Sequence, residues 1–303
     1  MSIPPFLLLG VLAALIWSFS NIIDKYMLGG HISNPAAVTF FTSIFGTGFS
    51  LILPFLGLVT FSSVALVGSS ILLGSLYILP ILLYMKALKI GEVSRVVPIF
   101  SSSPVFVVLL GAIFLGEIFS LRAYAGIFLT IAGSVIISSN KVGKEFFSFK
   151  LNKAFWTIIS STILLAIYSI LTKYLLQFDG FWNIFFWSRI GTLLPTAAIL
   201  MHSESRKAIF SALKNMRNNR LEYLGLSEFF NNLGVLIQTI ALSLGPVSLV
   251  RTAVSSQALF ILLITILLQL IYDYDLGDDL SRKTATTKAL ASALIIMGIY
   301  LIT

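Results

Sequence analysis

Three polar side chains, Glu228, Asn231 and Gln238, stand inside one long apolar segment of the chain. They follow one another at i, i+3 and i+10, so a helix would carry them on a single stripe. Charged and amide groups are expensive in hydrocarbon and usually face a cavity or a polar partner. The stripe therefore predicts a wall that binds a polar solute. The alternative is that the amides only bond to neighbouring helices.

Glu228 is the candidate for proton coupling, because it lies roughly two turns inside the apolar segment, where burial favours the neutral carboxyl. A permanent ion pair with an arginine is the competing interpretation. Arg189 and Arg251 also lie within apolar segments, and either could neutralise Glu228 or bind an anionic group of a substrate. Arg251 is expected to extend toward the membrane interface instead, which leaves Arg189 as the candidate substrate contact.

Aromatic residues supply a second group of candidates. Trp17 and Asn21 share one face of the first apolar segment, and Trp17 could stack on a flat or cationic solute. Trp187 also stands away from the ends of its segment, where anchoring at the membrane interface does not explain it. Packing against lipid remains the alternative for both tryptophans.

Two short runs of small polar residues interrupt apolar segments, at 101–104 (Ser-Ser-Ser-Pro) and at 255–257 (Ser-Ser-Gln). Small residues allow helices to cross closely and to unwind locally. Packing alone would account for both runs, with Ser101 and Gln257 as further candidate substrate contacts. Pro104 is predicted to bend its helix as part of a gate.

Enzyme chemistry has no visible place in the sequence. There is no cysteine, and neither His31 nor His202 has a second metal ligand at helical spacing. We therefore expect no catalytic residue, no metal site and no cofactor. The alternative from another class is a membrane-embedded transferase that uses the acidic loop 273–279 with a divalent metal, although the spacing does not complete a calcium loop.

The composition indicates which elements position these residues. Hydrophobic residues make up 57% of the 303 residues and charged residues 11%, so lipid must be the solvent. The long unalternated runs favour membrane helices over a barrel. The net charge of +8 is spread over short loops, which excludes a nucleic-acid surface. The fold class is an all-α membrane protein with predicted transmembrane helices near 5–28, 35–57, 63–89, 93–116, 121–139, 153–177, 181–201, 221–244, 246–271 and 285–303.

An internal repeat organises these ten helices. The segment 87–94 (ALKIGEVS) matches 241–248 (ALSLGPVS), and the two serine runs align at the same offset. The chain therefore divides into halves 1–140 and 153–303, joined by a basic loop at 141–152. Because five spans per half is an odd number, the second half must be inverted, which is typical of alternating-access transporters.

The repeat also predicts the opposite wall of the cavity. The offset places the polar stripe of the second half on Tyr77 and Tyr84 of the first half. It places the first helix on the sixth, where Tyr168 lies beside the residues that match Trp17 and Asn21. We therefore expect a cavity that is polar on one side and aromatic on the other, suited to an amphipathic organic solute.

The chain resembles the drug/metabolite transporter superfamily, in particular its EamA-type members with ten helices. The resemblance rests on the segment 13–21 (AALIWSFSN) before Lys25-Tyr26, on 87–104 and on Gly116-Glu117, followed by Gly126 and Gly133. It implies secondary transport of small organic solutes through a cavity among helices 1, 3, 4, 6, 8 and 9. It also implies that helices 5 and 10 lie at a homodimer interface or at the periphery.

Loop charge predicts the orientation. Of the twenty lysines and arginines, sixteen fall on the side opposite the termini, which the positive-inside rule assigns to the cytoplasm. Both termini are then outside, in what we expect to be a bacterial plasma (inner) membrane. The segment 204–220 predicts a basic amphipathic helix that suits the anionic cytoplasmic leaflet, with a solvated connector as the alternative.

The sequence thus predicts a secondary active transporter of small polar or amphipathic metabolites in the lipid bilayer. Coupling to a proton and exchange for a counter-substrate both remain open. The direction of transport and the identity of the substrate are not determined.

Overall fold

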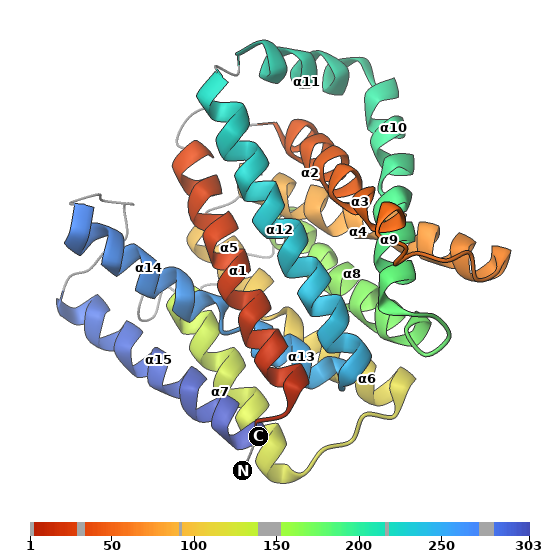
Figure 1. The fold of residues 1–303 in the computed structure, drawn as a ribbon. Helices are drawn as coiled ribbons and strands as arrows, with labels where there is room; N and C mark the ends of the chain where they lie inside the picture. Colours follow the sequence, from red (N-terminus) through yellow and green to blue (C-terminus); the bar gives the residue numbers. More distant parts are fainter. Residues whose placement is uncertain (1–2, 29–33, 91–92, 139–152, 216–217, 273–281) are drawn as a thin grey trace.

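The computed structural model describes residues 3–28, 34–90, 93–138, 153–215, 218–272 and 282–303, and within them every regular element is a helix (Figure 1). Eight stretches are long and apolar enough to cross a membrane. The prediction of an all-helical membrane protein is confirmed. The helices are α1 (Pro5–Leu28), α2 (Pro35–Ser50), α3 (Ile52–Phe55), α4 (Val64–Ile90), α5 (Val93–Ser101), α6 (Ser103–Leu115), α7 (Leu121–Ser138), α8 (Lys153–Leu175), α9 (Phe181–Gly191), α10 (Leu193–Met201), α11 (Ser203–Asn215), α12 (Asn218–Leu244), α13 (Val247–Val254), α14 (Gln257–Tyr272) and α15 (Arg282–Ile302).

Each stretch predicted as a span coincides with one helix or with two consecutive helices. The helices α12 and α15 are not among the eight apolar stretches. In α12 the reason is its polar stripe, which lowers the hydropathy of a helix that packs along the whole of α1. In α15 the apolar part, Thr286–Ile302, is short.

Prolines interrupt two of the predicted spans. The helix α2 ends at Ser50, four residues before Pro54, and α9 ends at Gly191, four residues before Pro195. A proline ring clashes with the carbonyl four residues earlier and donates no hydrogen bond to it, so the helix breaks at that carbonyl.

The two serine runs coincide with the other two breaks. The first run separates α5 from α6 at Ser102, and the second separates α13 from α14 at Ser255 and Ser256. Their hydroxyls turn back to bond nearby carbonyls, as Ser102 does to Ile99 and Ser256 to Ala253. The helices are thus interrupted at both runs, where small residues allow it.

Glycines set the closest helix contact at the edge of the bundle, where α7 lies along α15. A Cβ added at Gly133 would lie 2.6 Å from the Ala291 carbonyl oxygen, and one added at Gly126 would lie 2.6 Å from that of Gly298. These glycines therefore bring the two backbones into direct contact.

Both termini lie at one end of the bundle and α11 lies at the other (Figure 1). The predicted amphipathic segment 204–220 is helical through Asn215 as α11, and Ile209 is buried against Phe41 of α2. Phe210 and Leu213 are exposed. The predicted basic loop 141–152 and the acidic loop 273–279 lie outside the described residues.

Candidate functional site

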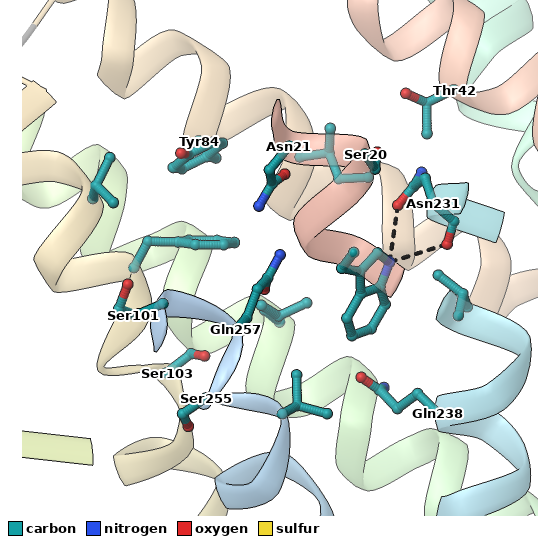
Figure 2. Close-up of a pocket in the computed structure, with 18 of the residues that line it drawn as sticks. Ser20, Asn21, Thr42, Tyr84, Ser101, Ser103, Asn231, Gln238, Ser255 and Gln257 are labelled. Atoms are coloured by element: carbon teal, nitrogen blue, oxygen red, sulfur yellow. Dashed lines mark hydrogen bonds between the residues drawn. The ribbon is translucent and has the colours of Figure 1, made fainter. Parts of the chain in front are cut away.

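A cavity of about 340 Å³ occupies the middle of the bundle (Figure 2). It is lined from the second half of α1 and of α4, from the first half of α2, from the middle of α8, from α12 between Leu224 and Gln238, and from the breaks in α5–α6 and α13–α14. The lining extends toward the end of the bundle that carries α11, where Leu224 packs in one cluster with Ile209 of that helix. Besides the six helices expected from the resemblance, α2 and the end of α7 contribute Val38, Thr42 and Ser138.

Most of the residues predicted from sequence meet in this cavity. The lining includes Trp17, Asn21, Tyr77, Tyr84, Ser101, Tyr168, Glu228, Asn231, Gln238 and Gln257. Sequence spacing could bring them together because each helix presents one face inward and the repeat gives the matching positions.

Trp187 and Arg189 do not line the cavity, although both were candidates for it. Trp187 packs against Phe61 and Phe186, with ring centroids 6.5 and 4.9 Å away. Two residues along a helix turn a side chain by about 200°, so Trp187 and Arg189 point to opposite sides of α9. Arg189 points inward, but it ends behind Tyr77, with its guanidinium carbon 4.7 Å from the centroid of that ring.

The polar stripe of α12 has the arrangement expected from its spacing. The Glu228 carboxylate accepts a hydrogen bond from Thr42 Oγ1 at 2.7 Å and one from Asn231 Nδ2 at 3.1 Å. Glu228 is buried, with 7% of its surface exposed. Asn232, four residues after Glu228, faces away from the cavity, and its side-chain amide donates to the Glu228 backbone carbonyl. Thr42 and Asn231 thus help to hold the carboxylate at the cavity wall.

Trp17 lies across α12. Its indole N–H donates to the Asn231 carbonyl at 3.0 Å and to Asn231 Oδ1 at 3.2 Å, the two dashed lines in Figure 2. The ring rests on Gly234, where an added Cβ would come within 2.8 Å of indole atoms. Trp17 therefore faces the cavity, and the alternative of packing against lipid does not hold.

The aromatic wall predicted from the repeat stands opposite. The Tyr77 and Tyr168 rings contact each other with centroids 5.0 Å apart, and Tyr84 lies 4.4 Å from Phe100. Gly74, about one turn before Tyr77 in α4, packs directly against the backbone of Ser188 and does not line the cavity. The cavity accordingly combines aromatic faces with amides and hydroxyls.

The helix breaks contribute polar side chains to the cavity wall. Ser101 bonds to Ser138 at 3.0 Å between their oxygens. In Figure 2 the amide ends of Asn21 and Gln257 point toward one another across the open space. No hydrogen bond from either amide to another described residue is present, so both are available to a solute.

Arg251 lines the cavity, although from the sequence we expected it to extend toward the membrane interface. Its side chain does not extend to the membrane interface. Arg251 lies in the short helix α13, and other helices surround α13. The arginine has 7% of its surface exposed, and its Nη1 donates to Gln238 Oε1 at 2.9 Å. The signal that could have found it is the neighbouring break at 255–256, which stops α13 at the cavity.

The end of the bundle nearer the termini is closed. Apolar side chains fill it, among them Val107, Leu242 and Val250, each fully buried. Beyond them the Glu117 carboxylate accepts hydrogen bonds from the backbone N–H groups of Val247 and Ser248 at the start of α13, at 2.6 and 3.0 Å. Lys173 donates to the Leu242 carbonyl at the end of α12. Each charge has the sign that stabilises the helix end it contacts.

A helical bundle of this hydropathy with a central, partly polar cavity defines an integral membrane protein that can hold a small solute. The model of the EamA-like transporter family matches residues 5–139. This part of the chain thus matches a family of the drug/metabolite transporter superfamily, which agrees with the resemblance seen in the sequence. The match indicates a membrane transporter of this type, a class that works in the lipid bilayer on small-molecule substrates.

Comparison of structures agrees on the fold. A solved structure, described only as a crystal structure of a protein, is similar to the chain with a TM-score of 0.74 at 16% identity, over 98% of this chain and 96% of the other. No curated protein sequence matches the chain.

Proposed function

We propose that the chain is a secondary transporter that moves small polar or amphipathic organic solutes by alternating access, with the central cavity as the binding site. The observation that carries the proposal is the pair of matched helix breaks at Ser102 and at Ser255–Ser256, both at the cavity wall. Discontinuous helices that line a midplane site are typical of transporters built from inverted repeats.

The architecture in this proposal is ten membrane crossings in two inverted halves, 1–140 and 153–303. The cavity takes residues from both halves, so a rocking motion of one half against the other would change which end is open. The apolar cluster around Val250 closes the end near the termini. With the termini outside, as loop charge predicts, this conformation would face the cytoplasm.

Two experiments test the direction and the solute. A reporter fused to the C-terminus that fluoresced only in the cytoplasm would overturn the proposed orientation. A thermal-stability screen of the purified protein against a metabolite library identifies the solute, since a ligand at a hundred times its dissociation constant stabilises by about 2.7 kcal/mol. Uptake of each hit into liposomes then tests transport itself.

Within this function, Glu228 is the candidate proton carrier. It is buried at the wall of the cavity, where Thr42 and Asn231 donate hydrogen bonds to its carboxylate. We expect Glu228→Gln to abolish the response of uptake to an imposed pH gradient while solute exchange without a gradient continues. Full gradient-driven uptake by this variant would show that Glu228 carries no proton and would favour plain exchange.

A further inference from the structure

The charges around the cavity are placed unequally along it. Among the described lining residues the only carboxylate is that of Glu228 and the only cation is that of Arg251. Arg251 is tied to Gln238, which follows Glu228 by ten residues, or about 15 Å along a helix. The two charges therefore stand at different depths, and Arg251 marks the deeper, closed end.

Arg251 has no acidic partner among the described residues. Its Nη1 is occupied by Gln238, and its Nη2 reaches Ser103 Oγ only at 3.4 Å. Its Nε is buried and has no hydrogen-bond partner among the described residues. The Nε and Nη2 N–H groups form the edge of a guanidinium that fits a carboxylate with two parallel hydrogen bonds. That edge is the unsatisfied one.

A second buried arginine adds positive potential beside the cavity. Arg189 is 1% exposed, and none of its three guanidinium nitrogens has a hydrogen-bond partner in the part of the chain that the structure describes. It stacks on Tyr77 behind the cavity wall, with its guanidinium carbon 4.7 Å from the ring centroid. A buried cation without a counter-charge is strongly unfavourable, so two of them favour an anion nearby.

From this arrangement we propose that the transported solute is an organic carboxylate, with its carboxylate on Arg251 and Ser103 and its apolar body against Tyr77, Tyr168 and Trp17. The inference rests on the proposed function of the cavity as the transport site. It specifies the substrate class: a small monoanion with an aromatic or other flat apolar part.

Paired probes test the charge preference. Benzoate, 3-phenylpropionate and indole-3-acetate are each compared with their neutral primary amides, as ligands of the purified protein in lipid nanodiscs at pH 7.5. We expect at least one acid to bind at least tenfold more tightly than its amide, measured by calorimetry and by the thermal midpoint. Arg251→Gln should abolish this preference. Arg251→Lys should keep part of it, because lysine retains the positive charge but not the paired N–H groups of the guanidinium.

The matched control is Arg122→Gln, which removes an exposed arginine that stacks on Tyr300 away from the cavity. It should leave the preference unchanged. If Arg251 only bridged α12 and α13, Arg251→Gln would lower stability and bind acid and amide with the wild-type ratio. That ratio, or no acid bound more tightly than its amide by wild type, would overturn the inference.

Transport separates this inference from the proposed function. Acids that bind through Arg251 but are never carried into liposomes would refute transport through the cavity and leave the anion site standing. Carriage of neutral or cationic solutes with no preference for acids would refute the carboxylate assignment and leave transport standing.

Discussion

The carboxylate of Glu117 offers the sharpest test of how the closed end is held. Gly116, in the left-handed region at φ +67°, ends α6 and turns the chain so that Glu117 faces the start of α13. There the carboxylate accepts from two backbone N–H groups and from the Ser248 hydroxyl. Gly111 leaves room for it, since a Cβ there would lie 2.9 Å from Glu117 Oε2.

Glu117→Gln keeps the size of the side chain and removes its charge. The remaining amide oxygen cannot accept from all three donors, and a buried donor without an acceptor costs about 1–3 kcal/mol. Loss of the charge at the helix N-terminus adds about 0.3–1 kcal/mol. We therefore expect the closed end to be weakened by about 2 kcal/mol, which corresponds to an increase of about thirtyfold in its opening equilibrium.

The assay uses the absence of cysteine from the chain. A Val250→Cys substitution places a thiol in the fully buried apolar cluster, where it reacts with a maleimide only when the closed end opens. Labelling of this single cysteine should be about thirtyfold faster with Glu117→Gln than without it, when the closed end opens and closes faster than the maleimide reacts. The matched control is Glu204→Gln, which removes an exposed carboxylate from the first turn of α11.

Equal labelling rates and equal thermal midpoints for the Glu117 and Glu204 variants would refute the reasoning. In that case the apolar cluster alone would keep the end closed. The carboxylate would then contribute only as much as an exposed charge at a helix start.

Two further substitutions test individual helix contacts. Gly133→Ala would place its Cβ 2.6 Å from the Ala291 carbonyl and should lower the thermal midpoint by forcing α7 from α15, a cost of about 1–3 kcal/mol; Gly68→Ala, with nothing within 4 Å, should be neutral or stabilising. An unchanged midpoint for Gly133→Ala would contradict direct backbone contact. Gly234→Ala should displace the Trp17 indole from its hydrogen bonds and weaken binding of any aromatic ligand of the cavity at least severalfold. Wild-type affinity in that variant would show that Trp17 does not contact the ligand.

The sequence predicted the membrane class and the helix positions, and most of the site residues that it proposed line the cavity. These features depend on hydropathy and periodicity along one helix, or on repetition at a fixed offset, and all of them are local properties of the chain. Even the aromatic wall of Tyr77 and Tyr84 follows from the repeat, because it transfers a face from one half to the other.

The tertiary structure decided which way individual side chains point and what they meet. Arg251 and Arg189 are both arginines within apolar segments, and only the packing of neighbouring helices puts the first at the cavity and the second behind Tyr77. The sequence alone allowed Trp17 to face lipid. In the structure its indole packs on Gly234 and donates to two oxygens of Asn231, residues more than two hundred positions away in the chain. The partners that fix such orientations come from distant parts of the chain, so spacing within a helix carries no information about them.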